Sequence, residues 1–309
     1  MNPKKVKKVK YLGRGIHNEK FLESLKNDNL KHMLQIINND YELDIQIRND
    51  YLNIYYRGGN IARVNSESSV EFDKFYFYLD MRITPKKFIK QNLKVVTELI
   101  SKRDILISKF KEGKYKEYFE QAKTVMNEWL KINPKPERME QHQLSTENKY
   151  NKSDYSIIDL EYEVSIKSDF ACKYTAKDKC KPKKPRFDII AINKQGKLCV
   201  IELKKGTAAL TNTSGLKEHW DCYQESIGRN YKPFMNEMRK LLEQKQDFDL
   251  IDRQVKIECS IPEFMFAYSY DDKSSEENQD KVFIKELNKI GVNIHAIKLP
   301  RGTLKLMDS

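Results

Sequence analysis

The stretch from Arg186 to Gly206 constrains the fold and the chemistry of this chain more than any other part of it. Its two apolar runs, Phe187–Asn193 and Lys197–Leu203, are separated by Lys-Gln-Gly. This length and composition predict two antiparallel strands joined by a three-residue loop, with a glycine in the left-handed conformation. Strands that are apolar on both faces are predicted to be buried within a sheet.

The loop also predicts which side chains share one face of the hairpin. It pairs Asn193 with Lys197. In that register Asp188 lies directly opposite Glu202, and cross-strand partners share a face. Side chains alternate along a strand, so Lys204 joins Glu202. Two buried acids are unfavourable unless they are paired or bind a metal, and one lysine neutralises only one of them. A hard divalent cation with oxygen ligands, Mg²⁺ or Mn²⁺, would complete the balance.

Acid-x-Lys tripeptides recur in this lysine-rich chain, but the others lie in polar stretches. Only Glu202-Leu203-Lys204 ends an apolar strand and has a second acid, Asp188, brought opposite by a tight loop. In these residues the sequence resembles the PD-(D/E)xK nuclease superfamily, which has the restriction-endonuclease-like fold. One departure is that Phe187, rather than proline, precedes the aspartate. The alternative interpretation is a partly exposed hairpin end where the lysine makes a salt bridge.

The resemblance implies a metal-dependent nuclease that hydrolyses phosphodiester bonds in nucleic acid, DNA rather than RNA. Asp188 and Glu202 would ligate Mg²⁺ or Mn²⁺ together with the backbone carbonyl of Leu203. Lys204 would orient the attacking water and stabilise charge that grows on the phosphate. A protein from a different functional class stays open as the alternative: a catalytically silent module of the same fold that binds nucleic acid or a protein partner.

The resemblance also implies a glutamate from the helix that precedes the first core strand. Glu137 is the first choice and Glu140 the second, although an acid in a first helical turn also complements the helix dipole. Weaker candidates for substrate contact are Gln141, Lys205, Lys217 and His219, and the alternative for the histidine is a residue without a role in the site.

Composition places the 309-residue chain among soluble proteins, with 39% hydrophobic and 33% charged residues. No apolar run approaches the ~20 residues of a transmembrane helix, and the basic N-terminus lacks the apolar stretch of a secretory signal. Five cysteines without a CxxC pair indicate reduced thiols, so we expect a cytoplasmic protein with no membrane partner. The net charge of +12 favours a polyanionic partner, although a general lysine and asparagine bias explains it equally well. The absence of GxxxxGK[ST] predicts ATP-independent chemistry.

The proline-rich segment 133–136 predicts a boundary between two domains. Residues 1–133 would form an α+β domain, with a helix over 17–37 that has a candidate break at 27–29, a β-meander over 43–79 and two long helices over 84–131, broken near Gly113. This domain is also the expected surface for a homodimer or protein partner. Residues 134–309 would form the nuclease domain, an α-β-β-β-α-β mixed sheet flanked by helices. Its predicted elements are a helix over 137–144, strands over 156–166, 187–193 and 197–203, helices over 215–227 and 233–246, a strand over 263–270, a helix over 275–291 and a strand over 293–299.

The first predicted core strand alternates strictly over its second half. Leu160 and Tyr162 are predicted to face the core, and Asp159 and Glu161 to face the other way. The lysine-rich segment 168–186 that follows would either hold a phosphate backbone or form a solvated surface loop.

Overall fold

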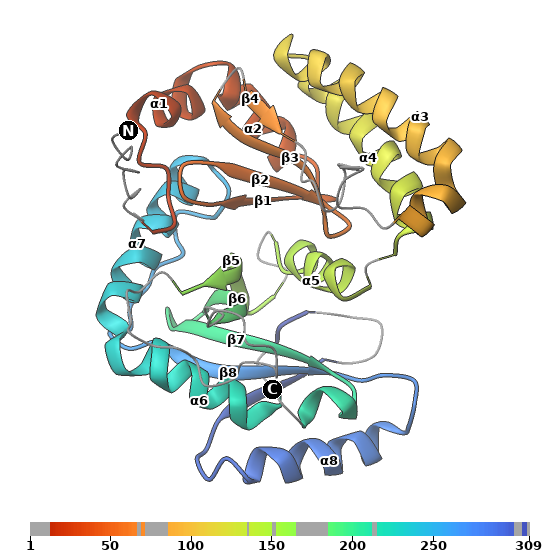
Figure 1. The fold of residues 1–309 in the computed structure, drawn as a ribbon. Helices are drawn as coiled ribbons and strands as arrows, with labels where there is room; N and C mark the ends of the chain where they lie inside the picture. The colour runs from red at the N-terminus through yellow and green to blue at the C-terminus, as the bar shows by residue number, and fades with distance from the viewer. Residues whose placement is uncertain are drawn as a thin grey trace, which may run out of the picture.

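The computed structural model describes residues 13–66, 69–71, 86–134, 136–149, 153–164, 185–211, 215–299 and 305–307. Within these residues the chain is a mixed α/β protein with two sheets, a four-stranded antiparallel one and a five-stranded mixed one (Figure 1). Among the helices described, none is long and apolar enough to cross a membrane.

The first sheet is the β-meander predicted from sequence. Its strands pair in chain order, each antiparallel to the next. They are β1 (Leu43–Ile47), β2 (Leu52–Tyr56), β3 (Gly59–Ser66) and β4 (Ser69–Glu71). Positions 72–79 of the predicted meander and the predicted helix start at 84–85 lie outside the described residues.

Two helical hairpins accompany this sheet. The first predicted helix is divided at Asp28, whose backbone is extended, into α1 (Glu19–Asn27) and α2 (Asn29–Asn38). The long helical region forms α3 (Lys86–Lys111) and α4 (Tyr115–Ile132), as predicted. Gly113, with φ of +74°, supplies the left-handed residue between them.

The C-terminal elements occur in the predicted order. A helix, α5 (Pro136–Glu147), comes first. The strands of the second sheet are β5 (Tyr155–Glu163), β6 (Arg186–Asn193), β7 (Leu198–Lys205), β8 (Glu263–Ser269) and β9 (His295–Leu299). The helices between β7 and β9 are η1 (Thr207–Leu210), α6 (Leu216–Ser226), η3 (Gly228–Asn230), α7 (Tyr231–Asp247) and α8 (Glu276–Asn288).

The second sheet changes strand direction in its middle. Strands β5, β6 and β7 are antiparallel, whereas β7, β8 and β9 are parallel, and the spatial order follows the chain. Its apolar side chains divide between two buried clusters, as expected for a sheet covered on both faces. The smaller cluster includes Leu144 of α5 and Leu306, and the larger includes residues of α6, α7 and α8.

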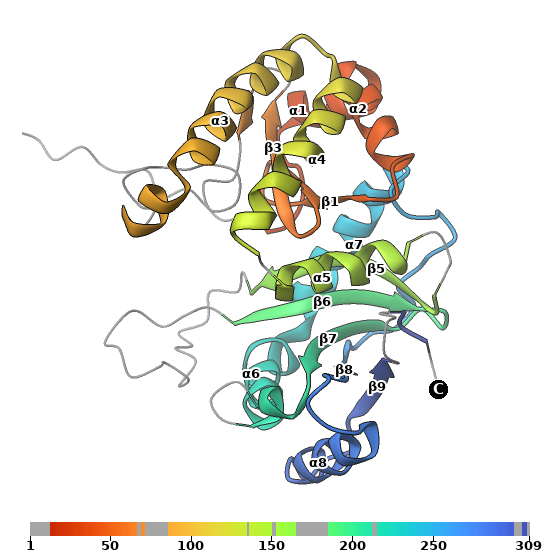
Figure 2. The ribbon, with the colours of Figure 1, turned by 90° about the vertical axis from the view of Figure 1, so that its right-hand side faces the viewer.

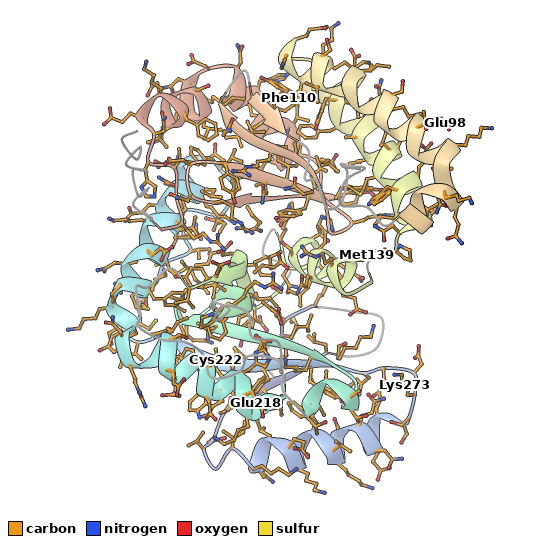
Figure 3. All side chains as sticks on the ribbon, in the orientation of Figure 1. Glu98, Phe110, Met139, Glu218, Cys222 and Lys273 are labelled. Atoms are coloured by element: carbon orange, nitrogen blue, oxygen red, sulfur yellow. The ribbon has the colours of Figure 1, made fainter. Side chains whose placement is uncertain are left out.

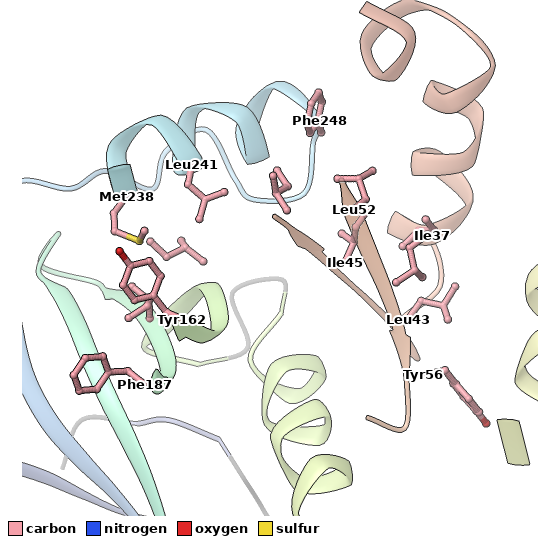
Figure 4. Close-up of a cluster of buried hydrophobic side chains, with 14 of the residues drawn as sticks. Ile37, Leu43, Ile45, Leu52, Tyr56, Tyr162, Phe187, Met238, Leu241 and Phe248 are labelled. Atoms are coloured by element: carbon pink, nitrogen blue, oxygen red, sulfur yellow. The ribbon is translucent and has the colours of Figure 1, made fainter. Parts of the chain in front are cut away.

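The larger cluster also continues into the first sheet and its helices. Helix α7 and the residue after it contribute side chains to both parts of this cluster. Met238 lies near Tyr162 of the second sheet, and Phe248, just past the helix end, lies toward Leu52 of the first sheet (Figure 4). Helix α5 lies between the two sheets, with Met139 on it (Figures 2 and 3). The domain division at 133/134 stays a prediction, and the buried contacts continue across it.

The alternation predicted for β5 is wrong at its centre. The register with β6 shifts between Ile157 and Asp159, and Glu161 has φ of +50°. This bulge turns Leu160 into the smaller buried cluster, whereas Tyr162 packs in the larger one. Asp159, predicted to face away from the core, is fully buried.

Asp159 is buried because two arginines from the N-terminal part of the chain reach it. Arg14 Nε donates to one carboxylate oxygen at 2.8 Å, and Arg48 Nη1 donates to the other at 2.5 Å. The same guanidinium groups donate to the backbone carbonyls of Glu161 and Leu160. This cluster fastens the first sheet to the edge strand of the second one.

Candidate functional site

The β6–β7 hairpin has the predicted register. Ile189 pairs with Ile201, and the Asn193 amide donates to the Lys197 carbonyl at 3.0 Å. Gly196 has φ of +75°, so the loop uses the left-handed conformation expected of it. Counting one position outward from the Ile189–Ile201 pair places the two predicted acids opposite each other at the open end of the hairpin.

Glu202 is the centre of the site. It is buried, and its Oε1 lies 3.2 Å from Lys204 Nζ and 2.9 Å from His219 Nδ1. Strand alternation brings Lys204 to the same face, and the first turns of α6 bring His219. The second carboxylate oxygen, Oε2, is buried and has no hydrogen-bond partner among the described residues.

Asp188 lies beside this glutamate and is held by two hydrogen bonds. The Leu203 amide donates to Oδ2 at 3.0 Å, and Gln141 Nε2 donates to Oδ1 at 3.3 Å. Gln141 is buried on α5, so this helix reaches the hairpin as expected from the resemblance. The sequence predicted that Gln141 contacts the substrate. In the structure its side chain contacts Asp188, one of the two acids.

The two carboxyl groups have opposite electrostatic environments. Burial, together with the charge of Glu202, raises the pKa of Asp188 well above its usual value, and Lys204 offsets this only in part. Burial also acts to raise the pKa of Glu202, but Lys204 and His219 outweigh it, so the pKa of Glu202 is lowered. The surroundings therefore oppose the charge of Asp188 and favour the charge of Glu202.

A hard divalent cation fits this arrangement. Glu202 Oε2 is a buried acceptor that receives no hydrogen bond from the described residues, so it is available to a cation. Asp188 supplies a second carboxylate next to it. Oxygen donors of this kind suit Mg²⁺ or Mn²⁺. Among the described residues, no three His, Cys, Asp or Glu side chains are grouped so that they could hold a metal ion. Among the described side chains, Asp188 and Glu202 would therefore be the two acidic ligands, with backbone, water or substrate oxygens completing the shell.

The other predicted site residues lie in the site, at its rim, away from it, or outside the described side chains. Leu203 enters the site through its amide, which donates to Asp188, and its predicted role as a carbonyl ligand stays a prediction. Glu140 pairs with Lys205 at the rim, beside the end of β7. Lys217 pairs with Asp221 on α6 at 2.8 Å and is half exposed, so it contacts none of the three central residues. Glu137 belongs to α5, but its side chain is outside the described ones.

Sequence reasoning missed two arginines at the rim of the site. Arg138 lies 3.3 Å from one Glu161 oxygen, and Arg186 lies 3.6 Å from the other. Glu161 stands across from Asp188, between two paired positions of β5 and β6. The signals were present: Arg138 is three residues before Gln141 on the helix, and Arg186 is two before the aspartate on its strand.

Comparisons with protein-family models, with curated proteins and with solved structures found no match to this chain.

Proposed function

We propose that this chain is a metal-dependent nuclease of the PD-(D/E)xK type, which hydrolyses phosphodiester bonds in nucleic acid, with DNA as the expected substrate. The observation that carries the proposal is the joint position of Asp188, Glu202 and Lys204 at one end of a buried hairpin. Burial of two acids that repel each other is unfavourable in free energy, and a Glu202 oxygen without a hydrogen-bond donor makes it more so. A cation shared by both acids offsets both costs.

The topology around the hairpin supports the same fold type. Helix α5 precedes three antiparallel strands, and a helical crossover then leads to the parallel strand β8. The acids lie at the carboxyl end of β7, where the parallel β7–β8 pair also ends. Ligands of α/β sheets bind outside the carboxyl ends of their strands.

The protein's own groups have distinct roles in the proposed reaction. Asp188 and Glu202 would hold Mg²⁺ or Mn²⁺, which when bound polarises a phosphate oxygen and acidifies water. Lys204, oriented by Glu202, would position the attacking water and stabilise charge on the phosphate. Few further groups are required, because charge stabilisation and positioning dominate phosphoryl transfer.

Residues around these three would position them and the substrate. His219 Nδ1 holds Glu202 Oε1, and Gln141 holds Asp188, so both acids keep a defined orientation. Arg138 and Arg186 would contact the nucleic-acid backbone, because guanidinium groups match phosphate geometry.

The test is cleavage of single- and double-stranded DNA and RNA with and without Mg²⁺ or Mn²⁺. The variant Lys204→Met is expected to lower kcat by about 10²–10³-fold, as the loss of one charge-stabilising donor does elsewhere. Lys197→Met, at the opposite end of the hairpin and exposed, is the matched control and keeps full activity. The proposal is refuted if no substrate is cleaved in a metal-dependent manner, or if both variants are equally active. Either result would favour the alternative, a catalytically silent module that binds nucleic acid or a protein partner.

A further inference from the structure

A cavity of about 560 Å³ lies where the N-terminal and C-terminal parts of the chain meet, and it contains none of the residues of the carboxylate site. Five segments form its wall: the end of α2, β1, the end of α5, β5, and the last turn of α7 with the residues that follow it. Its volume lies within the range of small-molecule sites. Apolar side chains that include Ile45, Ile157 and Leu250 line one part of it.

Lys245 is the unusual group of this cavity. It is nine-tenths or more buried, lines the cavity from the last turn of α7, and has no hydrogen bond or ion pair among the described residues. Two acids act on its charge, and both have other partners: Asp44 accepts from Ser145 and Gln46, and Asp159 accepts from the two arginines described above. Burial lowers the pKa of this lysine to about 8, which agrees with an ammonium group that lacks a partner.

The charges around the cavity define the ligand that it would take. Inside, Lys245 and Lys149 face one acid, Asp44, which leaves one positive charge in excess. At the outer edge Asp249 and Asp252 accompany the single cation Arg253, so that edge repels ligands with several negative charges. One anionic group would therefore lie on the lysines, and an uncharged body would pack on the apolar wall.

We propose that this cavity is a binding site for a small organic anion with a single negative charge, carried by a phosphodiester or a carboxylate, which pairs with Lys245. The site does not depend on the proposed nuclease activity. A bound anion would supply the partner that the buried ammonium lacks, and its body would contact residues from both parts of the chain.

Calorimetric titration of the whole protein tests this proposal with three probes: cyclic AMP as a phosphodiester monoanion, benzoate as a carboxylate, and inorganic phosphate. Saturable binding of cyclic AMP or benzoate is expected, and which of the two binds identifies the anionic group. Lys245→Met should weaken it at least tenfold, about 1.4 kcal/mol. Lys240→Met, exposed on the same helix, is the control and should bind as the wild type does.

Ser156→Phe provides a second variant, because it fills the cavity from β5 and leaves every charged residue of the lining in place. It should abolish binding, and it decides the outcome if Lys245→Met fails to fold. The proposal is overturned if neither organic anion binds, if only inorganic phosphate does, or if the Lys245→Met and Ser156→Phe variants bind as tightly as the wild type.

Discussion

Replacing Asp159 by asparagine should destabilise the protein more than any exposed charge substitution. The carboxylate is fully buried and accepts from Arg14 at 2.8 Å and from Arg48 at 2.5 Å, and both arginines are themselves buried. Asparagine keeps the shape but leaves two buried guanidinium groups without their anion. Removal of one partner from a buried ion pair costs about 3–5 kcal/mol, a large part of the 5–15 kcal/mol that holds a typical domain folded.

Urea unfolding at pH 7, followed by circular dichroism, measures this loss as a fall in the transition midpoint at constant slope. The matched control is Asp247→Asn, which breaks the half-exposed pair with Lys26 and should cost at most about 1 kcal/mol. A cost for Asp159→Asn no greater than that of the control would refute the reasoning. It would mean that the arginines do not fasten the N-terminal part to β5.

Two further predictions concern other parts of the chain. Gly196→Ala should lower the free energy of unfolding in urea by about 1–2 kcal/mol, because alanine is strained at φ of +75° and its Cβ would lie 2.8 Å from a Glu258 side-chain atom. An unchanged transition midpoint would contradict the loop geometry. Lys245 loses its proton near pH 8 when folded but near 10.5 when unfolded, so the unfolded state binds more protons between these values. Its contribution to the free energy of unfolding should therefore rise with pH across that window by roughly 3 kcal/mol. The difference between wild type and Lys245→Met isolates this effect, and a difference that does not change with pH would argue against a buried ammonium.

The hairpin was predictable because everything that determines it is local. A three-residue loop ending in glycine sets the pairing of Asn193 with Lys197, and the pairing sets which side chains oppose each other. The order of helices and strands was also predictable, because apolar periodicity marks each element and Asp28 and Gly113 mark the breaks.

Long-range contacts were not predictable in the same way. Arg14 and Arg48 lie 145 and 111 residues from Asp159, and no local pattern indicates that they meet. The alternation of β5 predicted that this aspartate faces away from the core, whereas the structure has a bulge beside it and both arginines on its carboxylate. The cavity around Lys245 likewise depends on five segments that only the tertiary fold assembles.

Binding of Mn²⁺ to the purified protein, followed by electron paramagnetic resonance of the free ion, tests the central claim most directly. The wild type is expected to bind the ion in a saturable manner. Asp188→Asn and Glu202→Gln should each weaken binding at least tenfold, about 1.4 kcal/mol, because each removes one of two shared carboxylates. Glu263→Gln, at the opposite end of the β7–β8 pair, should bind as the wild type does. Wild-type protein that binds no Mn²⁺, or equal binding by all four proteins, would contradict a cation site between Asp188 and Glu202.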